Sequence, residues 1–155
     1  MSTALRTIEF LCLGVWLGGI CLLSFVIAPG AFTILPTRDI AGTFVGFTLS
    51  RLHLIGIGAG VIYFVAHFLR SASFPELARY AAIAVVLMIL LTAFSQFYVT
   101  SQLAGLRAQM GSVENTPSDN PLHVSFDRLH RLSVALESAV LLLCIAAMYL
   151  TVRAS

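Results

Sequence analysis

The sequence has no lysine and very little charge of either sign. Charged residues make up 10% of its 155 residues, against about 25% in an ordinary soluble domain, while 59% are apolar, against about 45–50%. The nine basic residues are all arginines and stand singly along the chain, whereas a nucleic-acid binder gathers them into a patch. The composition therefore excludes an ordinary soluble domain, argues against a nucleic-acid partner and predicts a protein that lies in a lipid bilayer.

Cysteine is also scarce, and the common catalytic motifs are missing. Cys12, Cys21 and Cys144 are odd in number and lie inside apolar runs, so a disulfide framework is not expected. No P-loop, nucleophile elbow or metalloprotease motif occurs. A hydrolase or an ATP-driven pump is therefore not expected, and the sequence favours a protein without catalytic activity while leaving that question open.

What the sequence does have is four long apolar runs. Each is about 20 residues long, the length that a helix needs to cross a hydrocarbon core about 30 Å thick. With their flanking residues, the runs predict helices at about 6–28, 40–70, 76–100 and 126–153. We therefore predict an all-α, integral membrane four-helix bundle that forms a single domain over residues 1–155, with both termini on the same side.

Proline and glycine set the expected ends of these helices. Pro29, Gly30 and Pro36 are expected to end the first helix, because proline cannot continue the hydrogen-bond ladder. A short turn at 71–75 joins the second helix to the third, and a polar loop at about 101–125, with a helical extension at its start left open, joins the third to the fourth. We call the side with both termini and the 71–75 turn side A, and the opposite side, side B.

Two pairs of glycines predict a close helix crossing. Gly14 and Gly18 in the first helix, and Gly56 and Gly60 in the second, are four residues apart and share one helix face. Small residues on one face let two helix backbones approach closely. We expect the first and second helices to cross at these glycines, with Trp16 in the core.

Several segments resemble a bacterial family of unknown function that shares a domain with human transmembrane protein 205. They are residues 15–19 (VWLGG), 51–56 (RLHLIG), 95–100 (SQFYVT) and 126–133 (FDRLHRLS), the last followed by Leu136 and Glu137. The resemblance implies a four-helix protein of a bacterial cytoplasmic membrane, and the human relative is associated with resistance to a platinum drug. It supplies no established reaction. The tryptophan and glycines of the first helix are more distantly similar to copper resistance protein D and to a haem-containing protoporphyrinogen oxidase.

Glu137 is the residue that the membrane interpretation explains least, because a carboxyl group inside a membrane helix costs a few kcal/mol and normally faces a partner or water. Four polar side chains lie 16 to 18 residues from the arginine that flanks their helix on side A: Ser24, His53, Gln96 and Glu137. They are therefore expected in one layer, about 24–27 Å from side A. We expect His53 or Arg51 to contact Glu137 directly or through Gln96.

The polar side chains near this layer suggest a pocket that opens towards side B. Its candidate residues are Arg51, His53, Ser95, Gln96, His130, Ser133 and Glu137. The alternative is that these groups only satisfy one another's hydrogen bonds and hold the helices together.

Two metal-binding alternatives are also open. His53 and His130 could ligate a haem, since paired histidines on facing helices are a known bundle solution, although the residue count separates them by about 9 Å along the bundle. Cys12, Cys144 and Met148 could form a soft-metal site for Cu(I) or a platinum complex. The ordinary role of such residues is core packing, so no cofactor is expected and haem b is kept as the alternative.

Three kinds of function fit these residues. We favour the handling of a small solute or metal complex through the polar pocket. The second is a non-catalytic membrane module that acts through partner proteins, and the third is a haem- or quinone-linked redox protein. The expected partners are the lipid bilayer and a small-molecule or metal ligand, and a homo-oligomer is left open.

Overall fold

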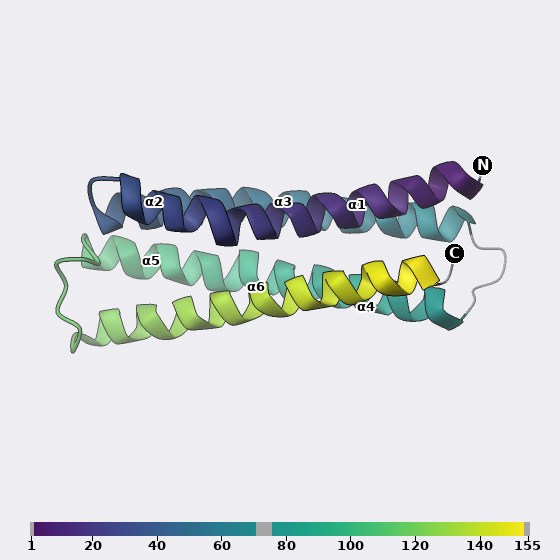
Figure 1. The fold of residues 1–155 in the computed structure, drawn as a ribbon. Helices are drawn as coiled ribbons and strands as arrows, with labels where there is room; N and C mark the ends of the chain where they lie inside the picture. The colour runs from purple at the N-terminus through teal and green to yellow at the C-terminus, as the bar shows by residue number, and fades with distance from the viewer. Residues whose placement is uncertain (1, 71–75, 154–155) are drawn as a thin grey trace.

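The structure is a computed structural model that describes residues 2–70 and 76–153, and within these residues it contains helices and no strands. Figure 1 shows four long helical spans side by side, with the two chain ends at the same end of the bundle. The prediction of an all-α four-helix bundle with both termini on one side is confirmed. The predicted turn at 71–75 lies outside the described residues.

Two of the spans are single helices, and two are interrupted by a π-helical turn. The second span is α3 (Arg38–Arg70), and the fourth is α6 (Pro121–Arg153). The first span consists of α1 (Ser2–Leu22), the turn η1 (Leu23–Ile27) and α2 (Ala28–Ile34). The third consists of α4 (Glu76–Phe94), the turn η2 (Ser95–Val99) and α5 (Thr100–Met110). Each span is long and apolar enough to cross a membrane, so the chain is a polytopic membrane protein.

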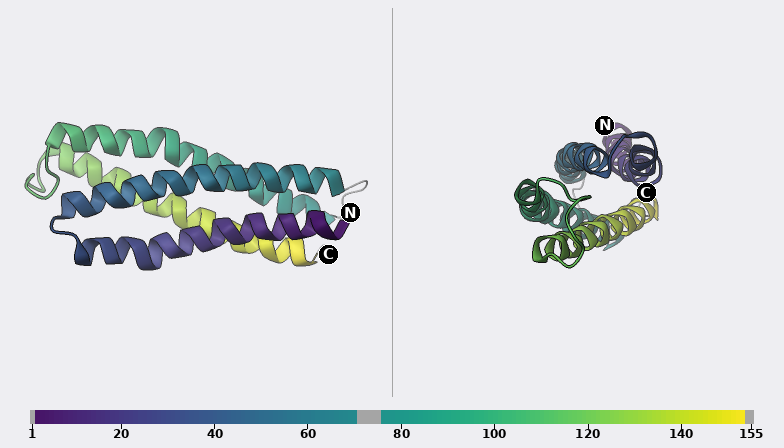
Figure 2. Two further views of the ribbon diagram at one scale, coloured as in Figure 1. Left: turned by 90° about the horizontal axis from the view of Figure 1, so that it is seen from above. Right: turned by 90° about the vertical axis from the view of Figure 1, so that its left-hand side faces the viewer.

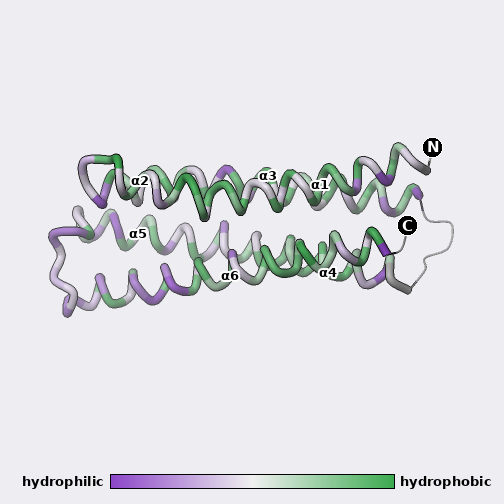
Figure 3. The backbone as a smooth tube through the Cα atoms, viewed as in Figure 1, coloured by the Kyte–Doolittle hydropathy of each residue, from purple (hydrophilic) through white to green (hydrophobic). Residues whose placement is uncertain are grey.

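The spans are longer than a bilayer requires. Each has 33 to 35 residues, which corresponds to about 50 Å of helix, whereas the hydrocarbon core is about 30 Å thick. Hydrophilic residues are frequent in α5, in the loop that follows it and in the first half of α6 (Figure 3). The side-B end of these two spans therefore carries the polar part of the bundle.

The expected end of the first helix at Pro29 and Gly30 is wrong, because the span continues to Ile34. The turn η1 ends two residues before the proline, and at its end the backbone N–H of Ala28 donates to the carbonyl of Leu23, five residues earlier. This wider turn places Pro29 at the start of α2, where its missing N–H and its ring are tolerated. The helix stops instead at Leu35, whose backbone is extended before Pro36.

The predicted polar loop at 101–125 is also shorter than expected. The third span continues to Met110, and α6 begins at Pro121, so the loop covers residues 111–120. Residues 101–110 contain no proline and consist largely of good helix formers. Gly111, with a φ of 70°, ends α5, and the Asn120 side chain caps α6 by accepting the Leu122 N–H at 2.9 Å.

The four spans surround a core that repeats along the bundle like a coiled coil. Seen from the side-B end (Figure 2, right), the first span and α3 lie side by side, and α6 runs obliquely across the view below them. Helices α1 and α4 both pack against α3 and α6. Along α4 and into η2, buried residues recur at alternating spacings of four and three: Ala81, Val85, Met88, Thr92 and Ser95. The two polar residues of this stripe, Thr92 and Ser95, therefore face the interior of the bundle.

The predicted glycine crossing is correct for α3 and wrong for α1. A Cβ atom on Gly56 would lie 2.5 Å from Nε1 of Trp16, and one on Gly60 would lie 2.8 Å from the same ring, so the indole packs directly on these glycines. Trp16 is buried, as expected. Gly14 and Gly18, however, face open space. They lie two residues from Trp16, about 200° around the helix, so a face that presents the indole to α3 turns them outwards.

Candidate functional site

Three helical spans meet at a polar cluster formed by Ser50, His53, Gln96 and Glu137. Nδ1 of His53 lies 3.0 Å from Oε1 of Gln96, and Nε2 lies 3.2 Å from Oε2 of Glu137. The Gln96 amide nitrogen donates to Oγ of Ser50 at 2.8 Å. The contact between His53 and Glu137 that the residue count predicts is therefore present, with Gln96 on the other ring nitrogen.

The hydrogen bonds of the polar cluster indicate which groups donate and which accept. Since the Gln96 amide nitrogen donates to Ser50, its oxygen is the atom that accepts from His53, so Nδ1 of His53 carries a hydrogen. One further proton then bridges Nε2 of His53 and the Glu137 carboxylate. Whether this proton resides on the imidazole or on the carboxyl group, the pair has no net charge. A neutral pair is the form that a low-dielectric site accepts.

The two partners of this pair differ in how deeply they are buried. The His53 side chain is 1% exposed, whereas the Glu137 side chain retains 15% exposure. Ser50 and Gln96 are also partly exposed, so His53 is the innermost group of the polar cluster and a molecule from outside the bundle would meet the other three before it.

The π-helical turn η2 supplies one wall of the polar cluster. It spans Ser95–Val99, and its last hydrogen bond joins the Thr100 N–H to the Ser95 carbonyl, five residues apart. The additional residue in this turn rotates the helix that follows it. The side chains of the turn therefore point in other directions than they would in a regular α-helix. Gln96 from the turn reaches His53, while Ser95 beside it is buried. Isolated π-helical turns occur frequently at functional sites.

Two buried hydroxyl groups on the same span have unused hydrogen-bonding capacity. Thr48 and Ser138, like several other hydroxyl residues of the bundle, donate to the backbone carbonyl four residues earlier. Thr92 and Ser95 are each 2% exposed, and their hydroxyls have no partner among the described residues. Gln96 lies one residue after Ser95 and four after Thr92, so spare polar capacity lies next to the polar cluster.

Other residues of the predicted pocket lie elsewhere. Arg51 is exposed, with its guanidinium 5.1 Å from the centre of the Phe47 ring, and it forms no ion pair with Glu137. Its long side chain extends along the surface of α3 instead of turning inwards. Ser133 is buried on the same face of α6 as Glu137, four residues before it. Ser24, expected in the same layer, is exposed on η1.

The two histidines proposed for haem are not arranged as a ligand pair. His130 is exposed and stacks on the Phe126 ring at a centroid distance of 6.3 Å. Both ring nitrogens of His53 are within hydrogen-bond distance of side chains of the polar cluster. Ligation of one iron by these two histidines would require that cluster to open.

The proposed soft-metal residues lie in the apolar core. Cys12 and Cys144 are buried in the main hydrophobic cluster, and Met148 packs against it. The Cys144 thiol donates to the Leu13 carbonyl at 3.5 Å. Among the described residues, no group of three or more histidines, cysteines and carboxylates could hold a metal ion. These positions show the packing role that cysteine and methionine usually have.

A second buried cluster lies near side A, and the sequence analysis did not predict it. Oε1 of Glu9 accepts hydrogen bonds from Nδ1 of His67 and Nε of Arg70, both at 3.1 Å. Glu9 is fully buried. The His67 ring stacks on Tyr63, whose hydroxyl lies 3.1 Å from that of Thr151. We call Glu9, His67 and Arg70 the side-A triad.

A signal for this triad was available in the sequence. Glu9 lies inside the first apolar run, just as Glu137 lies inside the fourth. Glu9 is close to the expected start of its helix, where a carboxylate can usually reach water. Its position therefore did not indicate a buried carboxyl group. Counted from Glu9, buried residues follow at the coiled-coil spacings, at Cys12, Leu13, Trp16 and Ile20.

Comparison with known proteins identifies a family but no function. No curated protein and no solved structure matches the chain. One family model, described as a domain of unknown function (DUF4149), matches residues 11–112. This range contains Ser50, His53 and Gln96 and ends before α6, which carries Glu137. The description names neither transmembrane protein 205 nor copper resistance protein D. Since the match covers about two thirds of the sequence, the chain belongs to the DUF4149 family.

Proposed function

We propose that the protein handles a small cationic solute or a cationic metal complex at the polar cluster of Ser50, His53, Gln96 and Glu137. The observation that carries the proposal is the contact of 3.2 Å between Nε2 of His53 and Oε2 of Glu137, in which the histidine is buried and the glutamate is partly exposed. An ionisable pair in a membrane helix is costly, and its usual justification is a solute or proton that it binds.

In the exchange that we propose, the cation takes the place of one proton. When that proton leaves, the cluster has a carboxylate and a neutral imidazole, and therefore a net charge of −1. A cation that enters at Glu137 then meets a carboxylate that lowers the net charge of the occupied site by one. The unpartnered hydroxyls of Thr92 and Ser95 supply further oxygen atoms for the solute or for its water. Binding of the cation is thus coupled to the release of about one proton.

The chemistry of the surroundings supports a cation over an anion. Arg51, which lies two residues before His53 in the sequence, packs against the Phe47 ring and does not point into the cluster. The groups that face the solute are a carboxylate, a carboxamide and hydroxyls. The proposed setting is the cytoplasmic membrane of a bacterium. The resemblance to the transmembrane protein 205 family agrees with a metal complex as the solute.

Calorimetric titration of the purified protein in lipid nanodiscs tests this proposal. The probes are Zn²⁺, a bare ion, and hexaamminecobalt(III), an inert complex that can bind only through charge and hydrogen bonds. We expect the wild type to bind at least one of them, and Glu137→Gln to weaken that binding by at least tenfold, because an amide cannot replace the lost negative charge. Repeating the titration in buffers with different ionisation enthalpies should reveal about one proton released per cation.

The matched control is Asp127→Asn, which makes the same change on α6 at an exposed position. Asp127 lies 3.8 Å from Nε2 of His123, so this variant also tests the surface pair most able to bind Zn²⁺ adventitiously. The control should bind like the wild type. The proposal is wrong if Glu137→Gln binds as tightly as the wild type, if Asp127→Asn alone loses binding, or if no proton is released.

A further inference from the structure

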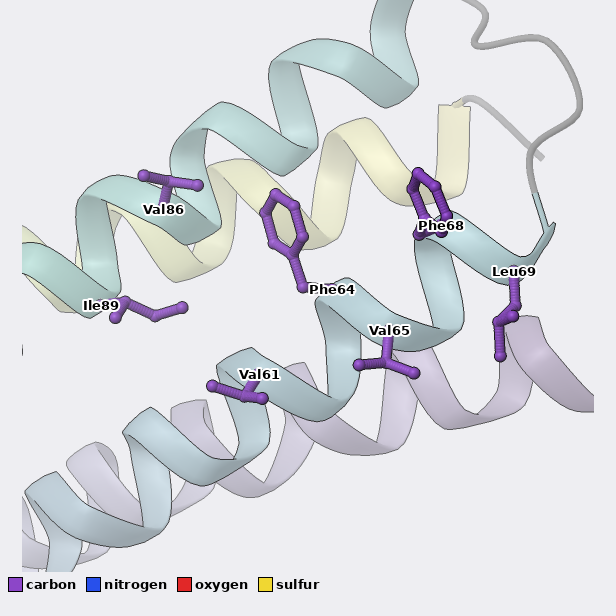
Figure 4. A pocket seen from close by; sticks show the side chains of 7 residues that line it. All are labelled: Val61, Phe64, Val65, Phe68, Leu69, Val86 and Ile89. Atoms are coloured by element: carbon purple, nitrogen blue, oxygen red, sulfur yellow. The ribbon is translucent and has the colours of Figure 1, made fainter.

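A groove runs along the outer side of the bundle between α3 and α4, near side A. It consists of two adjoining cavities of about 630 and 410 Å³, which share Phe64, Phe68 and Val86. Both are open to the outside of the bundle. Figure 4 shows the residues that line the larger cavity, where Phe64 extends from α3 towards α4, which contributes Val86 and Ile89. We call this feature the side-A groove.

The wall of the side-A groove on α3 is apolar and short. It is formed by residues three and four apart on one helix face: Val61, Phe64, Val65, Phe68 and Leu69. These eight residue steps correspond to about 12 Å along the helix. A further helix would pack over several turns, and this wall is too short for that. Its length suits a segment of a lipid acyl chain.

One end of the side-A groove is cationic. The smaller cavity is lined by His67 and Arg79 in addition to apolar residues. Arg79 is exposed and has no hydrogen bond or ion pair with any described residue. Arg70 is in a different situation, because its Nε donates inwards to Glu9. The side-A triad therefore engages one arginine and leaves Arg79 as the arginine that faces the side-A groove.

We propose that the side-A groove binds one anionic phospholipid, with an acyl chain between α3 and α4 and its phosphate at Arg79. An arginine beside an apolar cleft at the end of a membrane helix matches the two parts of such a lipid, because guanidinium donates paired hydrogen bonds to phosphate. The occupant is a lipid and not a free phosphate ion, since the lining is almost entirely apolar. This inference does not depend on the solute proposed for the polar cluster.

Native mass spectrometry of the detergent-solubilised protein tests the headgroup. Phosphatidylglycerol and phosphatidylcholine with the same acyl chains are added in equal amounts. We expect the wild type to retain phosphatidylglycerol about fivefold more than phosphatidylcholine, the effect of one basic residue near an anionic lipid. Arg79→Gln should abolish this preference. Arg153→Gln, at the same end of the bundle but outside the side-A groove, should preserve it.

A second pair of variants tests the acyl chain. Val65 and Val152 are both 55% exposed, but only the former lines the side-A groove. Val65→Trp should fill the groove and reduce the bound phosphatidylglycerol at least fivefold, whereas Val152→Trp should leave it unchanged. Glycerol phosphate, which has the phosphate without the chains, should not compete.

Several results would overturn the lipid assignment. They are equal retention of the two lipids by the wild type, equal behaviour of the two arginine variants, and unchanged lipid binding in Val65→Trp. Competition by glycerol phosphate would indicate an anion site without a chain. Loss of a dimer signal in Val65→Trp would identify the occupant as a second copy of the protein instead.

Discussion

Replacing Arg70 with methionine is expected to lower the free energy of unfolding by about 3 kcal/mol, the cost of removing one partner from a buried ion pair. The variant leaves the Glu9 carboxylate fully buried, with His67 as its remaining hydrogen-bond donor among the described residues. Oε2 of Glu9 already has no hydrogen-bond partner among the described residues, so this atom does not offset the loss of the bond from Arg70. Equilibrium unfolding by SDS in detergent micelles measures the effect, with the fluorescence of the single tryptophan, Trp16, as the signal.

The matched control for this prediction is Arg153→Met. Arg153 lies at the same end of the bundle, is exposed and donates to the Tyr149 hydroxyl, so its removal should change stability by less than about 0.5 kcal/mol. Glu9→Leu combined with Arg70→Met removes both charges and should recover more than half of the loss, because apolar residues can replace a buried ion pair at little cost. If Arg70→Met and Arg153→Met are equally stable, the side-A triad does not stabilise the bundle.

The comparison of sequence and structure shows which features a pattern can predict. Hydropathy identified the four spans because each needs about 20 apolar residues, and this requirement is local. It could not predict that the first span passes Pro29, because the π-helical turn before the proline compensates for the missing donor. The extension to Met110 was left open for a related reason: a polar sequence of good helix formers resembles a loop once it leaves the bilayer.

The same comparison explains the outcome for the candidate site. A count of residues along each helix placed His53 and Glu137 at one depth, and depth needs only the rise of 1.5 Å per residue. The direction of a side chain also requires the rotation of its helix, which the count does not contain. Arg51 and His130 were therefore assigned to a pocket from which both face away. Whether the pocket binds a solute stays a prediction.

Gly56→Ala is expected to lower the free energy of unfolding by about 2 kcal/mol, although alanine normally stabilises a helix by up to about 1 kcal/mol relative to glycine. The added Cβ would lie 2.5 Å from Nε1 and 2.6 Å from Cε2 of Trp16, so α1 and α3 must separate or the indole must move. The ring has little room to move, because Trp16 is 2% exposed and packed within the main hydrophobic cluster.

Gly14→Ala, on α1, is expected to change stability in the opposite direction from Gly56→Ala, on α3. An added Cβ there meets no atom within 4 Å, so only the gain in helix propensity remains, and stability should rise by up to about 1 kcal/mol. Combining Gly56→Ala with Trp16→Phe, whose smaller ring frees space, should cost less than the sum of the two single changes. Since this combination removes the fluorescent residue, unfolding of all four variants is followed by far-ultraviolet circular dichroism. Equal stabilities of Gly56→Ala and Gly14→Ala would show that the indole does not pack on α3 as described.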